Sequence, residues 1–325
     1  MKASSILLGS QPGSLREACG RAVTELASEF PNLVVLDADV AGGTGFYHFR
    51  KAFPERFIQC GIAEQNMVAM AAGMVDFGYI PVISSYAIFS TMRALEMVRN
   101  SIALPHLNVK ITGSHVGLDA GPDGATHQCI EDIGIMRTIP GLVILSPADT
   151  YDMRRAVRAM LEYRGPVYLR TGRSPVPDVY TTHDRLDNFV IGNADLLTDG
   201  NDVCLVGTGV MVARCLEARN VLANNRISAA VINMSSIKPA DKELLTRFAR
   251  KTGAIVTAED HNIMGGLGSC VAEIVCANYP VPIEMVGVQD KFGESGEPAE
   301  LAIKYKLMPK DIAEAAERVI KRKFP

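Results

Sequence analysis

The sequence predicts an α/β protein of two domains, each a mainly parallel sheet with helices on both faces. The 325-residue chain is longer than one ordinary domain. Short runs rich in Val and Ile alternate with longer helical patterns, and the alternation restarts after a stretch rich in proline and polar residues. This alternation is typical of buried parallel strands covered by helices. We expect a first domain at 1–175, a linker at 176–190 and a second domain at 191–325.

The composition argues against several classes of partner. The chain is 48% hydrophobic and 21% charged, with a formal net charge of −3 and no basic stripe, so nucleic acid is not expected. No apolar run approaches the roughly 20 residues that span a membrane, and the N-terminus lacks a signal-peptide core. The seven cysteines form no Cys-x-x-Cys pair, which indicates free thiols in a reducing cytosol. We therefore expect a cytoplasmic protein.

The first domain is expected to contain nine regular elements. The helical patterns cover 15–30, 63–77, 89–103 and 149–163, and the strand patterns cover 33–39, 81–85, 107–113, 142–146 and 167–170. The pattern at 63–77 has small or apolar residues on nearly every face, which predicts a buried helix.

The linker is expected within 174–189, because this stretch is rich in proline and polar residues and has neither helical nor strand periodicity. Eight further elements follow it. Strands are predicted at 203–207, 228–233, 254–258 and 283–288, and helices at 211–224, 240–252, 266–277 and 309–322. The second domain is therefore a smaller α/β unit.

Glu64 is the first candidate functional residue. It begins the apolar helix, directly after the strand-like segment at 56–60. A carboxylate at a helix start complements the helix dipole and can cap free amides, which requires no function. Apolar neighbours on both sides favour burial, however, and a buried carboxylate needs a dedicated partner. Both interpretations of Glu64 remain open at this level.

The segment 115–132 is the second candidate. It combines His115 and His127 with several carboxylates, three glycines and a proline, so it forms a shaped loop. A solvated turn is the alternative, and a zinc site lacks a third ligand at a familiar interval. The glycine clusters at 42–45 and 265–268 match neither a dinucleotide fingerprint nor a P-loop, and we assign them no ligand.

Several motifs together resemble the C-terminal two-thirds of transketolases and, less closely, of 1-deoxyxylulose-5-phosphate synthases. The most specific are GIAEQNM at 61–67 and DGATHQ at 123–128. Supporting motifs are LDADV at 36–40, YAIF at 86–89, GPVYLRTGR at 165–173 and EDHNIMGGLGS at 259–269. The resemblance implies a pyrimidine-binding domain, a transketolase C-terminal domain and the cofactor thiamine diphosphate.

The resemblance also implies which residues bind the cofactor. Glu64 matches the glutamate that hydrogen-bonds N1′ of the aminopyrimidine and favours its imino tautomer. Phe89 matches the ring that stacks on the pyrimidine, and Tyr86 lies one helical turn earlier. Asp39 matches an acidic residue near the thiazolium ring.

Five residues match substrate contacts of the family. Asp123 matches the residue that binds a sugar hydroxyl, and His127 matches a histidine at the reaction centre that can shuttle a proton. His115 matches a phosphate-binding histidine. Arg16 and Arg173 match the arginines that hold the sugar phosphate, where a planar guanidinium suits an oxyanion.

Two positions depart from the transketolase pattern. Gly43 stands where transketolases place a serine on the substrate phosphate, and Thr44 is the nearest hydroxyl to replace it. Met92 stands where transketolases often carry a third aromatic ring. Both departures leave the identity of the sugars open.

The resemblance covers nearly the whole chain, but the chain lacks the family's motif for Mg²⁺ and the cofactor's diphosphate. Family members bind Mg²⁺ and the diphosphate through Gly-Asp-Gly and a later Asn, and the nearest segment here is Pro122-Asp123-Gly124 in the loop. We therefore assign no metal ligand to this chain. We expect a separate N-terminal transketolase subunit to bind the diphosphate and Mg²⁺, in a complex of two copies of each chain.

The expected activity is transfer of a two-carbon glycolaldehyde unit from a ketose to an aldose, with a phosphate or another anionic group on the substrate. Three alternatives remain. The chain could be the β subunit of a 2-oxo acid dehydrogenase first component, although that family usually lacks the Thr-His-Gln at 126–128. It could act as a 1-deoxyxylulose-5-phosphate synthase, or as a non-catalytic scaffold.

Overall fold

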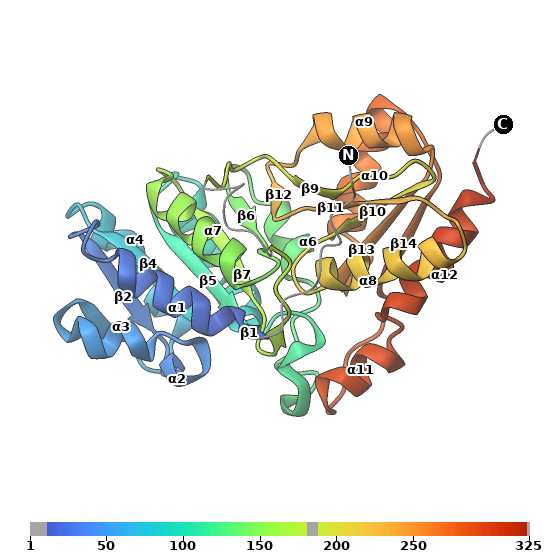
Figure 1. Cartoon of the computed structure of the whole chain (residues 1–325). Coiled ribbons are helices and arrows are strands. Elements are labelled where there is room, and N and C mark those ends of the chain that lie inside the picture. Colours follow the sequence, from blue (N-terminus) through green and yellow to red (C-terminus); the bar gives the residue numbers. More distant parts are fainter. Residues whose placement is uncertain (1–11, 181–187, 324–325) are drawn as a thin grey trace.

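Two large β-sheets lie side by side in the computed structural model, which describes residues 12–180 and 188–323 (Figure 1). Both sheets are mainly parallel and carry helices on both faces, which confirms the predicted fold class. None of the helices in this described part is long and apolar enough to cross a membrane. All seven cysteines are free; five are buried, whereas Cys60 is half-buried and Cys276 is exposed.

The first sheet has seven strands in the described residues, in the order β12-β6-β7-β5-β4-β2-β3. They are β2 (Leu33–Asp37), β3 (Phe57–Gln59), β4 (Ile80–Tyr86), β5 (Lys110–Ser114), β6 (Val143–Leu145), β7 (Val167–Thr171) and β12 (Ser236–Lys238). All neighbouring pairs are parallel except β12 with β6. Their carboxyl ends therefore meet at one edge of the sheet.

Helices cover both faces of the first sheet. They are α1 (Leu15–Leu26), α2 (Ala41–Thr44), α3 (Tyr47–Ala52), α4 (Glu64–Val75), α5 (Leu95–Met97), α6 (Asp132–Arg137) and α7 (Thr150–Glu162). Alternate residues of β2 belong to different cores: Val35 packs in the cluster of α1 and α7, and Leu36 in the cluster of α4. This alternation follows from the period of two along a strand.

The second sheet has the order β14-β13-β10-β11-β9 in the part of the chain described. Its strands are β9 (Asp195–Thr198), β10 (Val203–Gly207), β11 (Ala229–Asn233), β13 (Ile255–Asn262) and β14 (Ile283–Val288). Its helices are α8 (Met211–Asn224), α9 (Lys242–Thr252), α10 (Leu267–Asn278), α11 (Pro298–Lys304) and α12 (Pro309–Ile320). Residues of α8 and α12 share one core with this sheet, and residues of α9 and α10 share the other.

Two antiparallel strands were not predicted. β9 pairs with β11 at the edge of the second sheet. β12 belongs to the second half of the chain but pairs with β6 in the first sheet, so that Ser236 lies opposite Leu145. Both strands have only three or four residues, which is too short for a clear alternation. One buried core also continues from the first sheet into the second half of the chain.

The predicted helix at 89–103 is not a regular α-helix. Residues Phe89–Arg93 and Val98–Ala103 are π-helical, with α5 between them. The N–H of Ala94 donates to the carbonyl of Phe89 at 3.1 Å, five residues earlier. Such widened turns are frequent at functional sites and leave no signature in hydrophobic periodicity.

The predicted linker contains ordered segments. β8 (Pro175–Val176) pairs with β1 (Gly13–Ser14), and Val179 and Tyr180 are buried. Residues 181–187 of the predicted linker lie outside the described residues, as do 1–11 and 324–325. The division at 1–175, 176–190 and 191–325 therefore stays a proposal.

Candidate active site at the carboxyl edge of the first sheet

The carboxyl edge of the first sheet collects most of the candidate residues. Tyr86 ends β4, His115 directly follows β5, Asp39 lies two residues beyond β2, and Arg173 lies two residues beyond β7. Glu64 begins α4, after β3. Ligands of open parallel sheets bind outside this edge, so the topology alone places these residues where a ligand is expected.

Arg16 approaches the same edge from α1. It lies in the first turn of that helix, where the helix dipole disfavours a cation, so its position is not explained by helix stability. Its Nη1 donates to the carbonyl of Gly43 at 2.7 Å. Its Nε is buried and has no hydrogen-bond partner among the described residues, which leaves one donor available for an anionic ligand.

Tyr86 is the centre of an aromatic cluster. Its ring lies 3.9 Å from the His115 ring and 6.0 Å from the Phe89 ring, centroid to centroid, and both pairs are stacked. His127 meets the edges of this cluster, at 6.2 Å from Tyr86 and 5.4 Å from Phe89. Four of the candidate residues are thus in one contiguous group, with the rings in geometries that aromatic pairs prefer.

Gly43 is needed because Tyr86 occupies the space beside it. A Cβ atom at position 43 would lie 2.5 Å from the Tyr86 hydroxyl oxygen. The sequence suggested Thr44 as a replacement for the missing serine. The structure contradicts this, because the Thr44 side chain is buried and receives a hydrogen bond from Ser84 Oγ at 2.8 Å. The hydroxyl nearest to the expected serine position is therefore that of Tyr86.

Glu64 is buried, with 2% of its side chain exposed. Nη1 of Arg93 donates to both carboxylate oxygens, at 2.9 Å to Oε1 and 2.8 Å to Oε2. Glu64 thus has a dedicated partner, as a buried carboxylate requires. The sequence analysis missed Arg93, although its position four residues after Phe89 was a signal that both side chains share one face.

Asp39 is held by Gln59 and not by a residue of the aromatic cluster, within the part of the chain that the structure describes. It is exposed and has a left-handed backbone, with φ of 64°. Its N–H donates to Gln59 Oε1 at 3.0 Å, and its Oδ1 accepts from Gln59 Nε2 at 3.4 Å. Asp37 fixes the turn by accepting from the N–H of Val40 at 3.0 Å, and burial raises the pKa of Asp37. Gln59, for which the sequence indicated no role, therefore orients Asp39.

His115 is held as a neutral imidazole. Burial, with the positive charges of Arg16 and Arg173, lowers the pKa of His115 to about 3. Its Nδ1 lies 2.9 Å from Ser114 Oγ. A neutral histidine can still bind an anion as a hydrogen-bond donor, but it adds no charge.

The loop between β5 and α6 carries Asp123 and His127. Asp123 lies 3.6 Å from Nη1 of Arg173, and both side chains are partly exposed. The same Nη1 donates to the carbonyl of Ala120 at 2.6 Å. Nδ1 of His127 lies 3.1 Å from Thr126 Oγ1, which orients the ring. The loop thereby brings His127 into the aromatic cluster and holds Arg173 through Asp123 and the carbonyl of Ala120.

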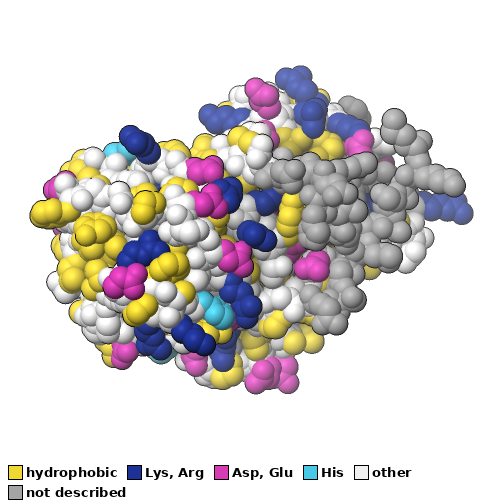
Figure 2. Space-filling model, turned by 60° about the vertical axis from the view of Figure 1, so that its left-hand side comes forward, with side chains coloured by type: hydrophobic (Ala, Val, Ile, Leu, Met, Phe, Trp, Pro, Cys, Tyr) yellow, Lys and Arg dark blue, Asp and Glu magenta, His cyan; other side chains and the backbone are white. Residues whose placement is uncertain are grey.

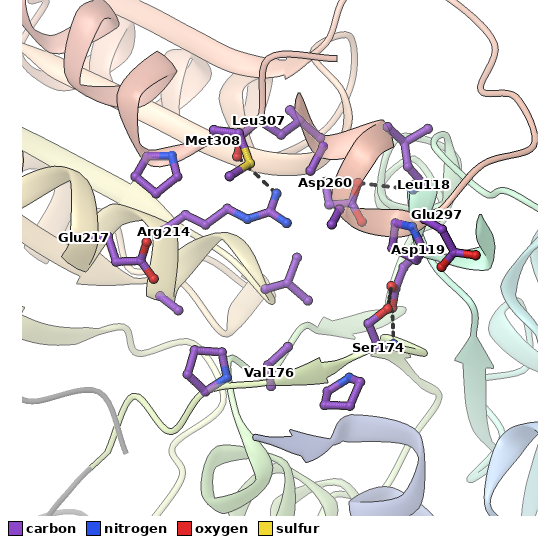
Figure 3. Close-up of a pocket in the computed structure, with 18 residues that line it drawn as sticks. Leu118, Asp119, Ser174, Val176, Arg214, Glu217, Asp260, Glu297, Leu307 and Met308 are labelled. Atoms are coloured by element: carbon purple, nitrogen blue, oxygen red, sulfur yellow. Dashed lines mark hydrogen bonds between the residues drawn. The ribbon is translucent and has the colours of Figure 1, made fainter. Parts of the chain in front are cut away.

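Residues of the second half of the chain contact this loop through hydrogen bonds. Gln128 Nε2 donates to the carbonyl of Glu294 at 2.9 Å, and Asp260 Oδ1 accepts from the N–H of Leu118 at 3.2 Å (Figure 3). Gly117 has φ of 62°, and a Cβ there would lie 2.0 Å from Asp260 Oδ2. Residues of the second half of the chain therefore position the loop.

A buried polar network joins the two halves next to the loop. Asp132 accepts from Arg170 Nε at 2.6 Å and from the Tyr168 hydroxyl at 2.8 Å. Arg170 Nη2 also donates to the carbonyl of Asp260 at 3.2 Å, and His261 Nε2 accepts from the N–H of Gly134 at 3.2 Å. A satisfied network of this kind fixes one arrangement of the loop and α6.

A cavity of about 470 Å³ lies on the other side of the loop (Figure 3). Asp119, Ser174, Arg214, Glu217 and Asp260 line it, together with apolar residues of α8, α11 and the linker. The residues that line it include none of the nine candidates from the sequence analysis. This cavity is therefore separate from the carboxyl-edge site.

α4 is only half-buried, which corrects the predicted burial of 63–77. Its residues Gln65, Asn66, Ala69, Met70 and Gly73 are exposed. The nearby Ile62 is 75% exposed. The periodicity was uninformative because small and apolar residues (Ala69, Met70 and Gly73) lie on the exposed side of this helix as well as on its buried side. Figure 2 shows hydrophobic side chains exposed beside charged and histidine side chains on one face of the molecule.

Two family models match the chain. The pyrimidine-binding domain of transketolase matches residues 11–178, and the C-terminal domain of transketolase matches residues 192–312. The chain belongs to the transketolase family. The family implies thiamine diphosphate as cofactor. The described residues contain no group of three or more His, Cys, Asp or Glu side chains that could hold a metal ion.

Two relatives correspond to this chain over nearly their whole length. The chain is 41% identical over 309 residues to a putative transketolase C-terminal section of Methanocaldococcus jannaschii, covering 95% of this chain and 96% of that one. It is also 41% identical to a subunit of a 6-deoxy-6-sulfo-D-fructose transketolase of Clostridium sp. (strain MSTE9), covering 95% of both. The chain therefore corresponds to the C-terminal part of a transketolase over nearly its whole length.

A solved structure of a split-gene transketolase, described as an inactive β4 tetramer, superposes with a TM-score of 0.88 at 44% identity, covering 97% of this chain and 100% of that one. The chain is also 37% identical to a 1-deoxy-D-xylulose-5-phosphate synthase of Symbiobacterium thermophilum. It spans only 48% of that enzyme's length.

Replacing Gly43 by serine tests the packing of Tyr86. The added Cβ would force the tyrosine ring out of its stack with His115, so we expect Gly43→Ser to lower the free energy of unfolding by about 1–3 kcal/mol. Gly42→Ser is the matched control, because nothing lies within 4 Å of a Cβ at that position. Chemical denaturation of both variants measures the difference. Equal stability of the two variants would contradict this packing.

The protonation of His115 gives a pH-dependent prediction. Its folded-state pKa of about 3 lies below the ordinary value of 6.5, so the stability it contributes is present above pH 6.5 and is lost as the pH falls towards 3. We expect the His115 imidazole resonance to stay constant between about pH 5 and 8. An NMR titration, with His115→Asn for assignment, checks this. A midpoint near the ordinary value would contradict the burial of a neutral ring.

Proposed function

We propose that the chain provides the pyrimidine-binding half of a thiamine diphosphate site and catalyses, with an N-terminal subunit, transfer of a two-carbon unit from a ketose to an aldose. The observation that carries this proposal is the buried Glu64 carboxylate, which shares its partner Arg93 with the Phe89 ring at the carboxyl edge of a parallel sheet. A ring that carries N–H donors and a planar face fits both groups. The family assignment supports the same cofactor.

The residues of this chain have separate roles in the proposed reaction. Thiamine diphosphate supplies the carbon nucleophile and the electron sink needed to break the bond next to a ketose carbonyl. Glu64 accepts a hydrogen bond from the aminopyrimidine, and Phe89 stacks on that ring. Asp39, held by Gln59, lies near the thiazolium ring. Tyr86 supports the stack through its contact with Phe89.

The substrate is held by the other candidates. Asp123 binds a hydroxyl next to the reacting carbonyl, and His127 moves a proton at the sugar oxygen. Arg16 and Arg173 attract the anionic end, with the free Nε of Arg16 and the neutral His115 as hydrogen-bond donors. Because Gly43 supplies no hydroxyl, both phosphate and sulfonate remain candidates for that anion. The Clostridium relative is a transketolase of 6-deoxy-6-sulfo-D-fructose, which supports sulfonate as one of these two candidates.

We infer that the partner is an N-terminal transketolase subunit that binds Mg²⁺ and the diphosphate, in a complex of two copies of each chain. Ala69, Met70 and Gly73 form an exposed apolar part of α4 further along the helix from Glu64, so a partner that covers it would lie beside the cofactor site. The likeness to a C-terminal section of transketolase supports the same partner.

Dependence on the partner is tested by reconstitution. We expect negligible turnover from this chain with thiamine diphosphate and Mg²⁺, and turnover of xylulose 5-phosphate, or of a sulfonated ketose, only after the N-terminal subunit is added. Native mass spectrometry should then give two copies of each chain. Turnover by the single chain would contradict the split site. Decarboxylation of pyruvate by the reconstituted pair would favour the synthase or dehydrogenase alternatives.

Glu64→Gln tests the cofactor contact. We expect kcat of the reconstituted complex to fall by about 10²–10⁴-fold, the range typical of a lost proton-transfer group. Glu96→Gln is the matched control, because Glu96 is an exposed glutamate three residues after Arg93 whose carboxylate accepts a hydrogen bond from Asn100 Nδ2. An unchanged rate for Glu64→Gln would support the scaffold alternative.

A further inference from the structure

Arg93 makes two contacts at once in the candidate site. Its Nη1 donates to both oxygens of Glu64, at 2.9 and 2.8 Å, and its Cζ lies 4.4 Å from the centroid of the Phe89 ring. A single guanidinium therefore lies over the ring and against the carboxylate together. These are the two groups to which the proposed function assigns the aminopyrimidine.

The chemistry of a guanidinium explains why it fits there. It is planar, carries several N–H donors and stacks on aromatic faces. An aminopyrimidine shares the planar face and the N–H donors, so both groups suit the same pair of partners. The isolated chain also needs such a group, because a carboxylate that is 2% exposed is costly without a counter-charge.

The position of Arg93 also allows it to leave. Its side chain is 47% exposed, whereas that of Glu64 is 2% exposed. It ends the π-helical turn Phe89–Arg93, next to the exposed Met92. A long side chain at this position can swing into solvent without breaking the core, while Glu64 and Phe89 keep their places.

We propose that Arg93 is an internal surrogate for the aminopyrimidine: it holds Glu64 and Phe89 in place before assembly and is displaced when thiamine diphosphate binds. This inference rests on the proposed function. Its consequence is competition, because each binding event must break the Arg93–Glu64 pair. A competing contact lowers the apparent affinity by the fraction of molecules in which the site is free.

The alternative is a permanent ion pair that supports Glu64 in every state. The two roles predict opposite effects of removing the guanidinium. If the Arg93 guanidinium is displaced by the cofactor, it lowers the affinity for the cofactor, so its removal tightens binding. A permanent support aids the cofactor, so its removal weakens binding.

The test compares Arg93→Gln with the wild-type chain and with Arg99→Gln. Arg99 is a matched control, because it is an exposed arginine six residues further on that donates to Asn100 Oδ1 at 2.6 Å. Each full-length chain is mixed with the N-terminal subunit and titrated calorimetrically with thiamine diphosphate in excess Mg²⁺. The melting temperature of each cofactor-free chain is measured in parallel.

We expect Arg93→Gln to melt at a lower temperature without cofactor, because Glu64 loses its partner. We also expect this variant to bind thiamine diphosphate about tenfold more tightly, because one charged hydrogen-bonded pair no longer has to be broken. Arg99→Gln should match wild type in both measurements. Equal or weaker binding by Arg93→Gln would overturn the inference.

Two outcomes separate this inference from the proposed function. If the wild-type complex does not bind thiamine diphosphate, the proposed function itself fails. If it binds but Arg93→Gln binds no more tightly, only the surrogate role fails. Should Arg93→Gln not fold, Arg93→Lys decides instead. It keeps an ion pair with Glu64 but loses the planar stack on Phe89, so one of the two contacts that the cofactor must replace is gone and binding should be moderately tighter than in the wild type. Binding that is equal or weaker would overturn the inference.

Discussion

A carboxylate buried at the start of a helix is the constraint on which the site depends. Glu64 is placed by the end of β3 and the apolar α4, and it is too deeply buried to be satisfied by water. Whatever occupies the site must therefore bring N–H donors or a positive charge to this position. In the isolated chain Arg93 does so, and in the proposed complex the cofactor ring takes its place.

The rest of the site is built around that carboxylate by parallel topology. The carboxyl ends of β2, β4, β5 and β7 bring together side chains that are more than a hundred residues apart in the sequence. The second half of the chain then fixes the long loop, through Asp260 and the backbone at Glu294. One half of the molecule supplies the functional side chains, and the other restricts where they point.

Much of this arrangement could be predicted from the sequence. The alternation of strand and helix patterns gave the fold class, and the rule that parallel strands end at a shared edge brings Tyr86 and His115 together. The short strand β12 was missed, because a three-residue strand carries no readable period. Nor could the periodicity reveal that α4 is apolar yet half-exposed, since a hydrophobic pattern does not tell a core from an interface between subunits.

The contacts of individual polar side chains were also beyond the sequence. Thr44 was a plausible hydroxyl for the substrate anion, but it is buried against Ser84, and the space beside Gly43 belongs to Tyr86. The spacing of Arg93 from Phe89 indicated a shared face, but not the contact with Glu64, which depends on a π-helical turn that sets Arg93 over Phe89. Such contacts depend on local backbone geometry within a few ångströms, and residue spacing alone does not specify it.

The most direct test of this account is a crystal structure of the chain with its N-terminal subunit, thiamine diphosphate and Mg²⁺. The account predicts a Glu64 carboxylate oxygen within hydrogen-bond distance of the pyrimidine N1′, about 2.6–3.2 Å, with the guanidinium of Arg93 moved away. A structure in which Glu64 remains paired with Arg93, while the pyrimidine ring lies elsewhere, would contradict it.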